Sequence, residues 1–162
     1  MGLETREQEG EEMVKVKEVD IEKLRMEIEL AERLLENPPF HYPPRGKART
    51  IIDKRGKDGS HLFCIYVSLN PLSHDNDGQA SSPREHLTLI EIGKPRLFRG
   101  REVRIYNIEI DEENCRVYRH EDAERWFAEH GCFTMWGLLP SRDAREVNEE
   151  ERTRVLRILG LM

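Results

Sequence analysis

The feature that most limits how this chain can fold is a series of strand-like segments joined by short turns. Residues 61–69 are the clearest of them, because β-branched and aromatic side chains occur throughout. The turn before them ends in Asp58-Gly59, and glycine there supplies the positive φ of a tight hairpin. The other segments are 49–53, 85–92, 101–110 and a short one at 115–118. Strands at hairpin spacing pair with their neighbours, which predicts an antiparallel, meander-like sheet of four to five strands.

A helix is expected before these strands. Apolar residues repeat there at steps of three and four, as in the seam of a coiled coil, and Pro38-Pro39 ends the helix because proline cannot continue it. The stripe consists of Val14, Ile21, Leu24, Ile28, Ala31 and Leu35. Two interpretations are open: the stripe packs on the protein's own sheet, or it joins this chain to a second copy.

Two more helices are expected after the strands. The first covers 121–130, with an acidic first turn and Gly131 as its stop. The second begins after Asn148, which forms a capping box with Glu151. The predicted fold is therefore α+β, with an N-terminal helix, the antiparallel sheet, and the C-terminal helices packed on one face.

The length of 162 residues is typical of one domain. Residues 1–12 are acidic and have almost nothing to bury, which predicts disorder. Residues 13–140 are expected to form the α+β domain, and 141–162 a C-terminal helix that belongs to it or serves oligomerisation. Abundant Glu and Arg with only two Gln are typical of a thermophile, although an ordinary highly charged cytosolic protein is the alternative.

The sequence favours a cytoplasmic location without membrane contact. Its three cysteines, Cys64, Cys115 and Cys132, are odd in number and include no C-x-x-C pair, which favours a reducing compartment. The N-terminus lacks the character of a signal peptide, and no apolar run approaches the roughly 20 residues that span a bilayer.

Charge is divided unevenly along the chain. Residues 1–37 carry six Lys/Arg and twelve Asp/Glu. Residues 45–104 carry twelve Lys/Arg and seven Asp/Glu, and residues 105–162 carry eight Lys/Arg and thirteen Asp/Glu. The basic middle indicates a positive surface suited to an anionic, chain-like ligand. A hypothesis from the same division is that the acidic termini cover this surface in place of the ligand.

Two stretches combine cations with aromatic rings. Lys and Arg neutralise phosphates while rings stack on exposed bases, so the combination suits single-stranded nucleic acid. The first consists of Phe40, Tyr42, Arg45, Lys47, Arg49, Lys54, Arg55 and Lys57. The second consists of Lys94, Arg96, Phe98, Arg99, Arg101, Arg104 and Tyr106. For the first, the alternative is a solvated hairpin tip whose aromatic rings close the edge of the core.

Alternation along the strands predicts a possible stacking platform. Arg104 and Tyr106 face the same way because alternate residues of a strand share a face. If that face is open and also carries Tyr66, it would stack bases and bind phosphates. Otherwise the tyrosines pack under helices, with their hydroxyls at the rim. A third aromatic group has two parts. Trp126 and Phe127 lie on the expected helix and are typical of core. Phe133 and Trp136 lie after that helix and are typical of either core or a cleft.

No motif indicates catalysis or a cofactor. The segment 74–78, with His86 beyond it, offers metal ligands, but alignment to a calcium-binding loop places Arg84 where a bidentate glutamate is required. Walker A, dinucleotide-binding, zinc-protease and serine-hydrolase motifs are absent from the sequence. We therefore expect no metal, no cofactor and no enzymatic activity.

The stretch Pro38-Pro39-Phe40-His41-Tyr42-Pro43-Pro44-Arg45-Gly46-Lys47 lies beside the basic hairpin. Together with size, composition and the helix–strands–helix order, it resembles the ThermoDBP group of single-stranded DNA-binding proteins from thermophilic archaea. In that family an aromatic cleft flanked by basic residues holds the strand, and the proteins oligomerise. The resemblance covers about residues 13–140 and implies cleft positions at Phe40, Tyr42, Phe98 and Phe133. The family's leucine-zipper segment has no clear counterpart here, because the last helix is short.

The leading interpretation is sequence-tolerant binding of single-stranded nucleic acid, DNA favoured over RNA, by a homo-oligomer (dimer or tetramer). One alternative is a protein-interaction or oligomerisation module without catalysis, using the stripe on the first helix. A less favoured alternative is a metal-dependent nuclease that uses His74, Asp75, Asp77 or His86.

Overall fold

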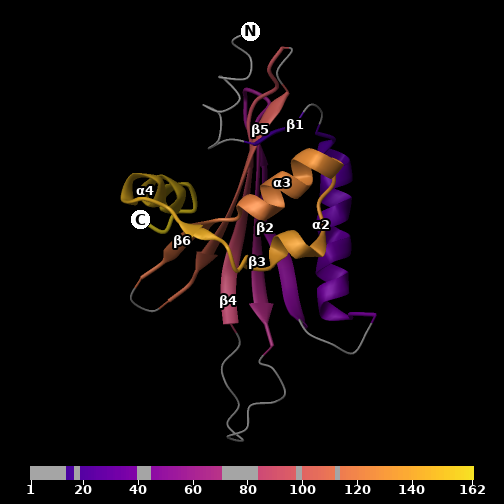
Figure 1. The fold of residues 1–162 in the computed structure, drawn as a ribbon, viewed down its shortest axis with the longest axis vertical. Coiled ribbons are helices and arrows are strands. Elements are labelled where there is room, and N and C mark those ends of the chain that lie inside the picture. The colour runs from indigo at the N-terminus through magenta and orange to yellow at the C-terminus, as the bar shows by residue number, and fades with distance from the viewer. Residues whose placement is uncertain (1–13, 17–18, 40–44, 71–83, 98–99, 112–113) are drawn as a thin grey trace, which may run out of the picture.

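The computed structural model describes residues 14–16, 19–39, 45–70, 84–97, 100–111 and 114–162 (Figure 1). Its elements are β1 (Val14–Val16), α2 (Ile21–Glu36), β2 (Gly46–Arg55), β3 (His61–Leu69), β4 (Arg84–Ile92), β5 (Arg101–Glu109), β6 (Arg116–Arg119), α3 (Glu121–His130), the 3-10 helix η1 (Met135–Leu138), β7 (Arg145–Glu146) and α4 (Glu149–Ile158).

The strands form one antiparallel sheet. Six of them follow one another in the order β2-β3-β4-β5-β6-β7, and β1 joins the sheet beside β5. The antiparallel α+β prediction is confirmed, but the count of four to five strands was too low. β7 has only two residues and lies directly before a helix cap, so no alternating pattern announces it. β1 was hidden in the expected helix, which starts at Ile21 and not at Val14.

Helices cover both faces of the sheet, which corrects the prediction of a single covered face. The α2 face, defined by Phe63, Ile65, Ile90, Val103 and Ile105, packs against α2, α3 and η1. The α4 face, defined by Cys64, Leu89, Tyr106, Ile108 and Val117, packs against α4. Figure 1 shows α4 on the opposite side of the strands from α2 and α3. The reason lies in β4, where residues 86–90 are all buried, so both faces need cover.

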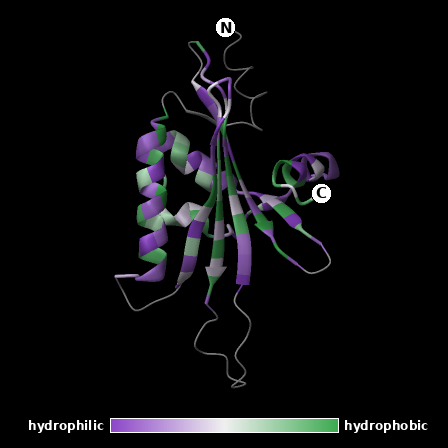
Figure 2. Ribbon diagram, turned by 180° about the vertical axis from the view of Figure 1, so that it is seen from behind, coloured by the Kyte–Doolittle hydropathy of each residue, from purple (hydrophilic) through white to green (hydrophobic). Residues whose placement is uncertain are grey.

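The apolar stripe of α2 packs on the protein's own sheet. The Asp20 carboxylate accepts a hydrogen bond from the Lys23 N–H at 3.1 Å and starts the helix. The buried side chains are Leu24, Ile28, Ala31 and Leu35. These residues belong to the core of the α2 face, so this stripe does not form a coiled-coil seam with a second copy. Figure 2 shows hydrophobic segments, in green, along the central strands that lie between the two cores.

A buried ion pair closes a gap in the sheet beside β5. β1 pairs with residues 101–103 and β6 with residues 106–109, so neither strand bonds to Ile105. The Ile105 N–H donates instead to Glu124 Oε2 at 2.9 Å, and the His120 N–H donates to the Ile105 carbonyl at 2.7 Å. Arg119 donates to both oxygens of Glu124 at 2.9–3.2 Å. The Glu124 side chain, which is 0% exposed, therefore supplies the hydrogen-bond acceptor that a neighbouring strand would otherwise provide.

Two buried histidines hold η1 and α3 in place. His86 Nε2 lies 2.6 Å from the Leu138 carbonyl, and His120 Nδ1 accepts the Ala123 N–H at 3.3 Å. Burial lowers the pKa of His86, and the Leu138 carbonyl opposes that shift. Burial also lowers the pKa of His120, opposed by the carbonyl of Trp136. Both side chains are therefore neutral in the folded protein near pH 7.

Acid should destabilise this arrangement. As pH falls below the ordinary value of 6.5, the unfolded chain takes up protons that the folded histidines resist, so the free energy of unfolding should decrease. Each histidine contributes up to about 1.4 kcal/mol per pH unit between its two pKa values. Urea unfolding at pH 7 and pH 5 measures the loss, and the double variant His86→Gln/His120→Asn should lose less. An equal loss in both proteins would contradict this role.

Candidate functional site

A row of cations follows the outer strand of the sheet. Lys47, Arg49 and Lys54 of β2 pair with Ser68, Tyr66 and Leu62 of β3, respectively. Cross-strand partners share a face, so all three cations lie on the α4 face, and all three are exposed. We call these three residues the cation row.

A β-bulge creates this row. Thr50 pairs with Ile65 and Ile52 with Cys64, which leaves Ile51 as an extra residue in β2. Strict alternation would place Lys54 on the face opposite Lys47 and Arg49, because 54 is even and the others are odd. The extra residue reverses the alternation, so the three side chains point the same way.

The remaining basic residues of the first stretch extend this positive edge. Arg45, Arg55 and Lys57 are also exposed, and Arg55 lies on the α2 face opposite His61. None of these three, and none of the cation row, forms an ion pair with another described residue. Seven other arginines in the described part of the chain do form ion pairs: Arg25, Arg96, Arg119, Arg125, Arg145, Arg152 and Arg154. Charge on an edge strand also discourages pairing with other sheets.

Tyr66 is the aromatic residue beside the cation row. It is half-buried and lies in register between Arg49 of β2 and Leu87 of β4. A hydrogen bond with the Glu85 carboxylate raises the pKa of Tyr66, with desolvation adding to the effect and Arg49 opposing it. Leu62 and Ile52 on the same face are also half-buried, so the surface next to the cations is partly apolar.

Tyr66, Arg104 and Tyr106, the expected platform, lie on the same face of the sheet, but α4 covers part of that face. Tyr106 is fully buried; its hydroxyl donates to Glu151 at 2.5 Å and accepts from Arg154 at 3.0 Å. Burial is the main cause of the raised pKa of Tyr106. This matches the alternative in which a tyrosine packs under a helix, so Tyr106 cannot stack on a base in this conformation.

Phe133 does not line an open cleft. It is buried in the core of the α2 face, and its N–H donates to Glu27 at 3.1 Å. Its ring lies so close to Gly137 that a Cβ there would stand 2.5 Å from Phe133 Cε1. The cleft position suggested for Phe133 by the family resemblance is therefore corrected to a core position.

The second basic stretch is scattered. Arg96 pairs with Glu102 at 2.8 Å, and Arg101 donates to the Gly59 carbonyl at 3.3 Å. Arg104 is half-buried and lines a groove of about 1100 Å³ that is bordered by α4, β5, β6 and β7. That groove also contains Glu146, Glu149, Glu150 and Glu151, so its charges are mixed.

Four predicted binding residues, Phe40, Tyr42, Phe98 and Arg99, lie outside the described residues. The segment 74–78 also lies outside them. Among the residues that the structure does describe, no cluster of three or more His, Cys, Asp or Glu could hold a metal ion. His86 lies in the buried contact with Leu138 described above.

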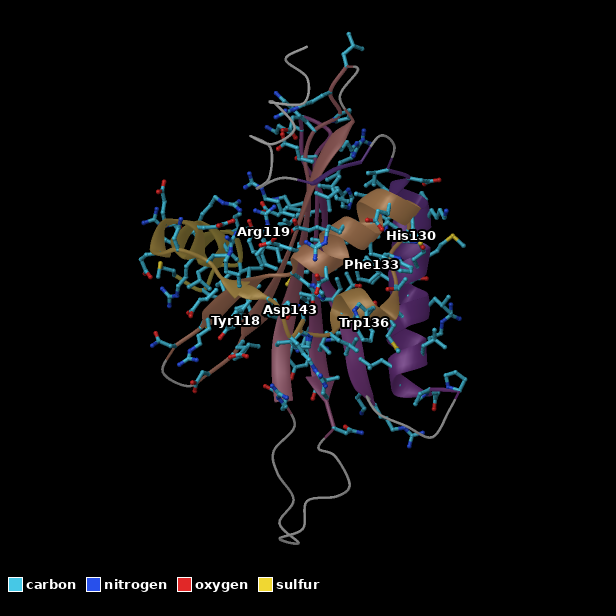
Figure 3. All side chains as sticks on the ribbon, in the orientation of Figure 1. Tyr118, Arg119, His130, Phe133, Trp136 and Asp143 are labelled. Carbon is cyan, nitrogen blue, oxygen red and sulfur yellow. The ribbon has the colours of Figure 1, made fainter. Side chains whose placement is uncertain are left out.

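Two tryptophans are more exposed than the sequence suggested. Trp126 is 43% exposed and stacks on His130 at 3.7 Å between ring centroids, so its prediction as core was wrong. Phe127 is buried, as expected. Trp136 on η1 is 67% exposed. Figure 3 shows Trp136 and His130 on the side of α2 and α3, away from the α4 face.

Comparison with protein-family models, curated proteins and solved structures finds no match to this chain. The described helices include none with the length and apolar character needed to cross a lipid bilayer.

Proposed function

We propose that this protein binds single-stranded nucleic acid without sequence preference, through the cation row and Tyr66. The observation that carries the proposal is the row itself: three exposed cations on one face of β2, with no ion-pair partner among the described residues. The resemblance to the ThermoDBP group supports the same proposal and is our reason for favouring DNA over RNA.

The chemistry of the row suits a polyanion. Lys47 and Arg49 are two residues apart on an extended strand and therefore about 7 Å apart, so neighbouring phosphates of an extended strand can each meet a cation. Tyr66 and the half-buried Leu62 offer an apolar surface beside the phosphates, on which a base can stack. The row contacts backbone phosphates, which every sequence has, so binding should tolerate sequence changes.

Fluorescence anisotropy of a labelled single-stranded oligonucleotide tests the proposal. Binding should be tight at low salt, weaken as salt is added, and resist competition by duplex. Parallel DNA and RNA oligonucleotides distinguish the two ligands. Failure to bind either strand at low salt would reject the proposal and favour an interaction module without nucleic acid.

Replacement of Tyr66 tests the stacking contact separately. Tyr66→Ala should weaken binding by about 1–3 kcal/mol, because a stacked base would lose its ring partner. Tyr66→Phe keeps the ring and should bind like the original protein. Tyr118→Ala on β6 is the matched control, since Tyr118 is also half-buried and lies away from β2 (Figure 3). Equal binding by all three variants would exclude stacking on Tyr66.

A further inference from the structure

The carboxylate of Glu85 lies at the border of the proposed binding surface. Glu85 is exposed near the start of β4 and pairs with Ser68 of β3, whose partner on β2 is Lys47 of the cation row. Cross-strand partners share a face, so Glu85 lies on the α4 face together with Lys47. The Tyr66 hydroxyl, two residues along β3 from Ser68, donates a hydrogen bond to this carboxylate. A negative charge is therefore held beside the ring on which a base would stack.

Among the described residues, no cation forms an ion pair with Glu85. The other carboxylate on the α4 face of β2 to β4 is that of Glu91, and Arg154 of α4 binds its two oxygens at 2.8–2.9 Å. Asp53 of β2 lies on the α2 face. An ionised carboxylate has about four acceptor positions, of which the Tyr66 hydroxyl uses one. Glu85 therefore keeps its charge and most of its acceptor capacity for a ligand.

Three neighbouring strands present their groups in the same order as the parts of a nucleotide. β2, β3 and β4 lie side by side at intervals of about 4.8 Å (Figure 1). On the α4 face they carry, in turn, the cation row, the Tyr66 ring and the Glu85 carboxylate. A nucleotide runs from its phosphate through the sugar to the base, and the Watson–Crick edge of the base is at the far end. With the phosphate on β2 and the base stacked on Tyr66, that edge points toward Glu85.

Guanine is the base whose Watson–Crick edge best matches a carboxylate. It has two adjacent donors there, the N1–H and the N2 amino group, which can meet the two carboxylate oxygens. In adenine and cytosine the amino group adjoins a ring nitrogen that repels a carboxylate. In thymine and uracil the single N–H lies between two carbonyl oxygens. We propose that Glu85 recognises the base stacked on Tyr66 and gives otherwise sequence-tolerant binding a preference for guanine at that position.

This inference rests on the proposed binding of single-stranded nucleic acid, and three labelled DNA strands of equal length test it by fluorescence anisotropy. One strand contains thymidine only, and in the other two every second residue is deoxyguanosine or deoxyinosine. Inosine keeps the purine ring and the N1–H but lacks the N2 amino group, so the comparison separates hydrogen bonding from stacking. The original protein should bind the guanosine strand about fivefold more tightly than the inosine strand.

Replacement of Glu85 should change two affinities in opposite directions. Glu85→Ala should bind the guanosine strand more weakly, and no better than the inosine strand, because the acceptor is gone. It should bind the thymidine strand more tightly, because a carboxylate no longer repels the phosphates. A merely structural role for Glu85 would not produce this pair of effects.

Glu36→Ala is the matched control. Glu36 is exposed at the end of α2, which covers the other face of the sheet. This variant has the same change in net charge and should keep the preference for guanosine over inosine. Both side chains are exposed, so both variants should fold, and circular dichroism checks this.

The outcomes separate this inference from the proposed function. If the original protein binds all three strands but does not distinguish guanosine from inosine, recognition by Glu85 is wrong and single-strand binding stands. The same conclusion follows if the preference survives in Glu85→Ala. If the original protein binds none of the strands, both proposals are rejected.

Discussion

Replacing Glu124 by alanine is expected to lower the free energy of unfolding by about 3–5 kcal/mol, because it leaves the Arg119 guanidinium buried without its counter-charge. Arg119 is 4% exposed, and its Nε and Nη2 both donate to the Glu124 carboxylate. The same change deprives the Ile105 N–H of its acceptor in the gap between β1 and β6 along one edge of β5. Urea or thermal unfolding measures the loss.

The matched control is the surface pair of Glu149 and Arg152. The Glu149 side chain is exposed, and its contact to Arg152 at 3.1 Å lies in the first turn of α4. Glu149→Ala should therefore cost less than about 1 kcal/mol. Losses of similar size in the two variants would show that the Glu124–Arg119 pair does not close the sheet.

Reversing the charge of the cation row should abolish nucleic-acid binding. The variant Lys47→Glu/Arg49→Glu/Lys54→Glu replaces three phosphate contacts with three repulsive carboxylates. All three side chains are exposed, so the protein should still fold. Anisotropy with a labelled single strand measures the effect, and we expect no detectable binding at a salt concentration where the original protein is saturated.

The control for this variant carries the same change in net charge elsewhere. Arg116, Arg142 and Arg157 are exposed and lie on β6, in the loop before β7 and on α4. Arg116→Glu/Arg142→Glu/Arg157→Glu should bind with only a modest loss, because long-range attraction falls while the local contacts remain. Equal loss in both triple variants would mean that overall charge, and not the cation row, governs binding.

Local signals in the sequence predicted most of the elements. His61–Leu69 and Glu121–His130 have the expected bounds, and Asn148 accepts the Glu151 N–H at 2.8 Å as the capping box required. Gly131 ends α3 with φ 66° and Gly59 turns the hairpin with φ 89°. These features depend on neighbouring residues only, so a single sequence is sufficient to find them.

Features that depend on distant contacts were not predictable in the same way. The side of the sheet on which α4 packs depends on the depth of burial of β4 and β5, which local periodicity does not fix. The bulge at Ile51 has no marker such as glycine, yet it decides that Lys54 joins Lys47 and Arg49. Glu124 looked like an ordinary residue of an acidic helix start, and only its contact with β5 reveals its role.

The candidate site was predictable in composition but not in arrangement. The basic residues of the first stretch form a positive edge, whereas Tyr106 and Phe133 are buried in opposite cores. Phe40, Tyr42, Phe98 and Arg99 lie outside the described residues, and their part in binding stays a prediction. Tyr66 is the aromatic residue of the prediction that the structure places beside the cations.

The salt dependence of single-strand binding tests the central claim most directly. The logarithm of the association constant should fall linearly with the logarithm of salt concentration, at about 0.7 per phosphate neutralised on a single strand. A variant with Lys47, Arg49 and Lys54 all changed to glutamine should bind more weakly, with a slope shallower by about 2. Binding with the same slope in both proteins, or binding that ignores salt, would contradict the claim that the cation row holds the nucleic acid.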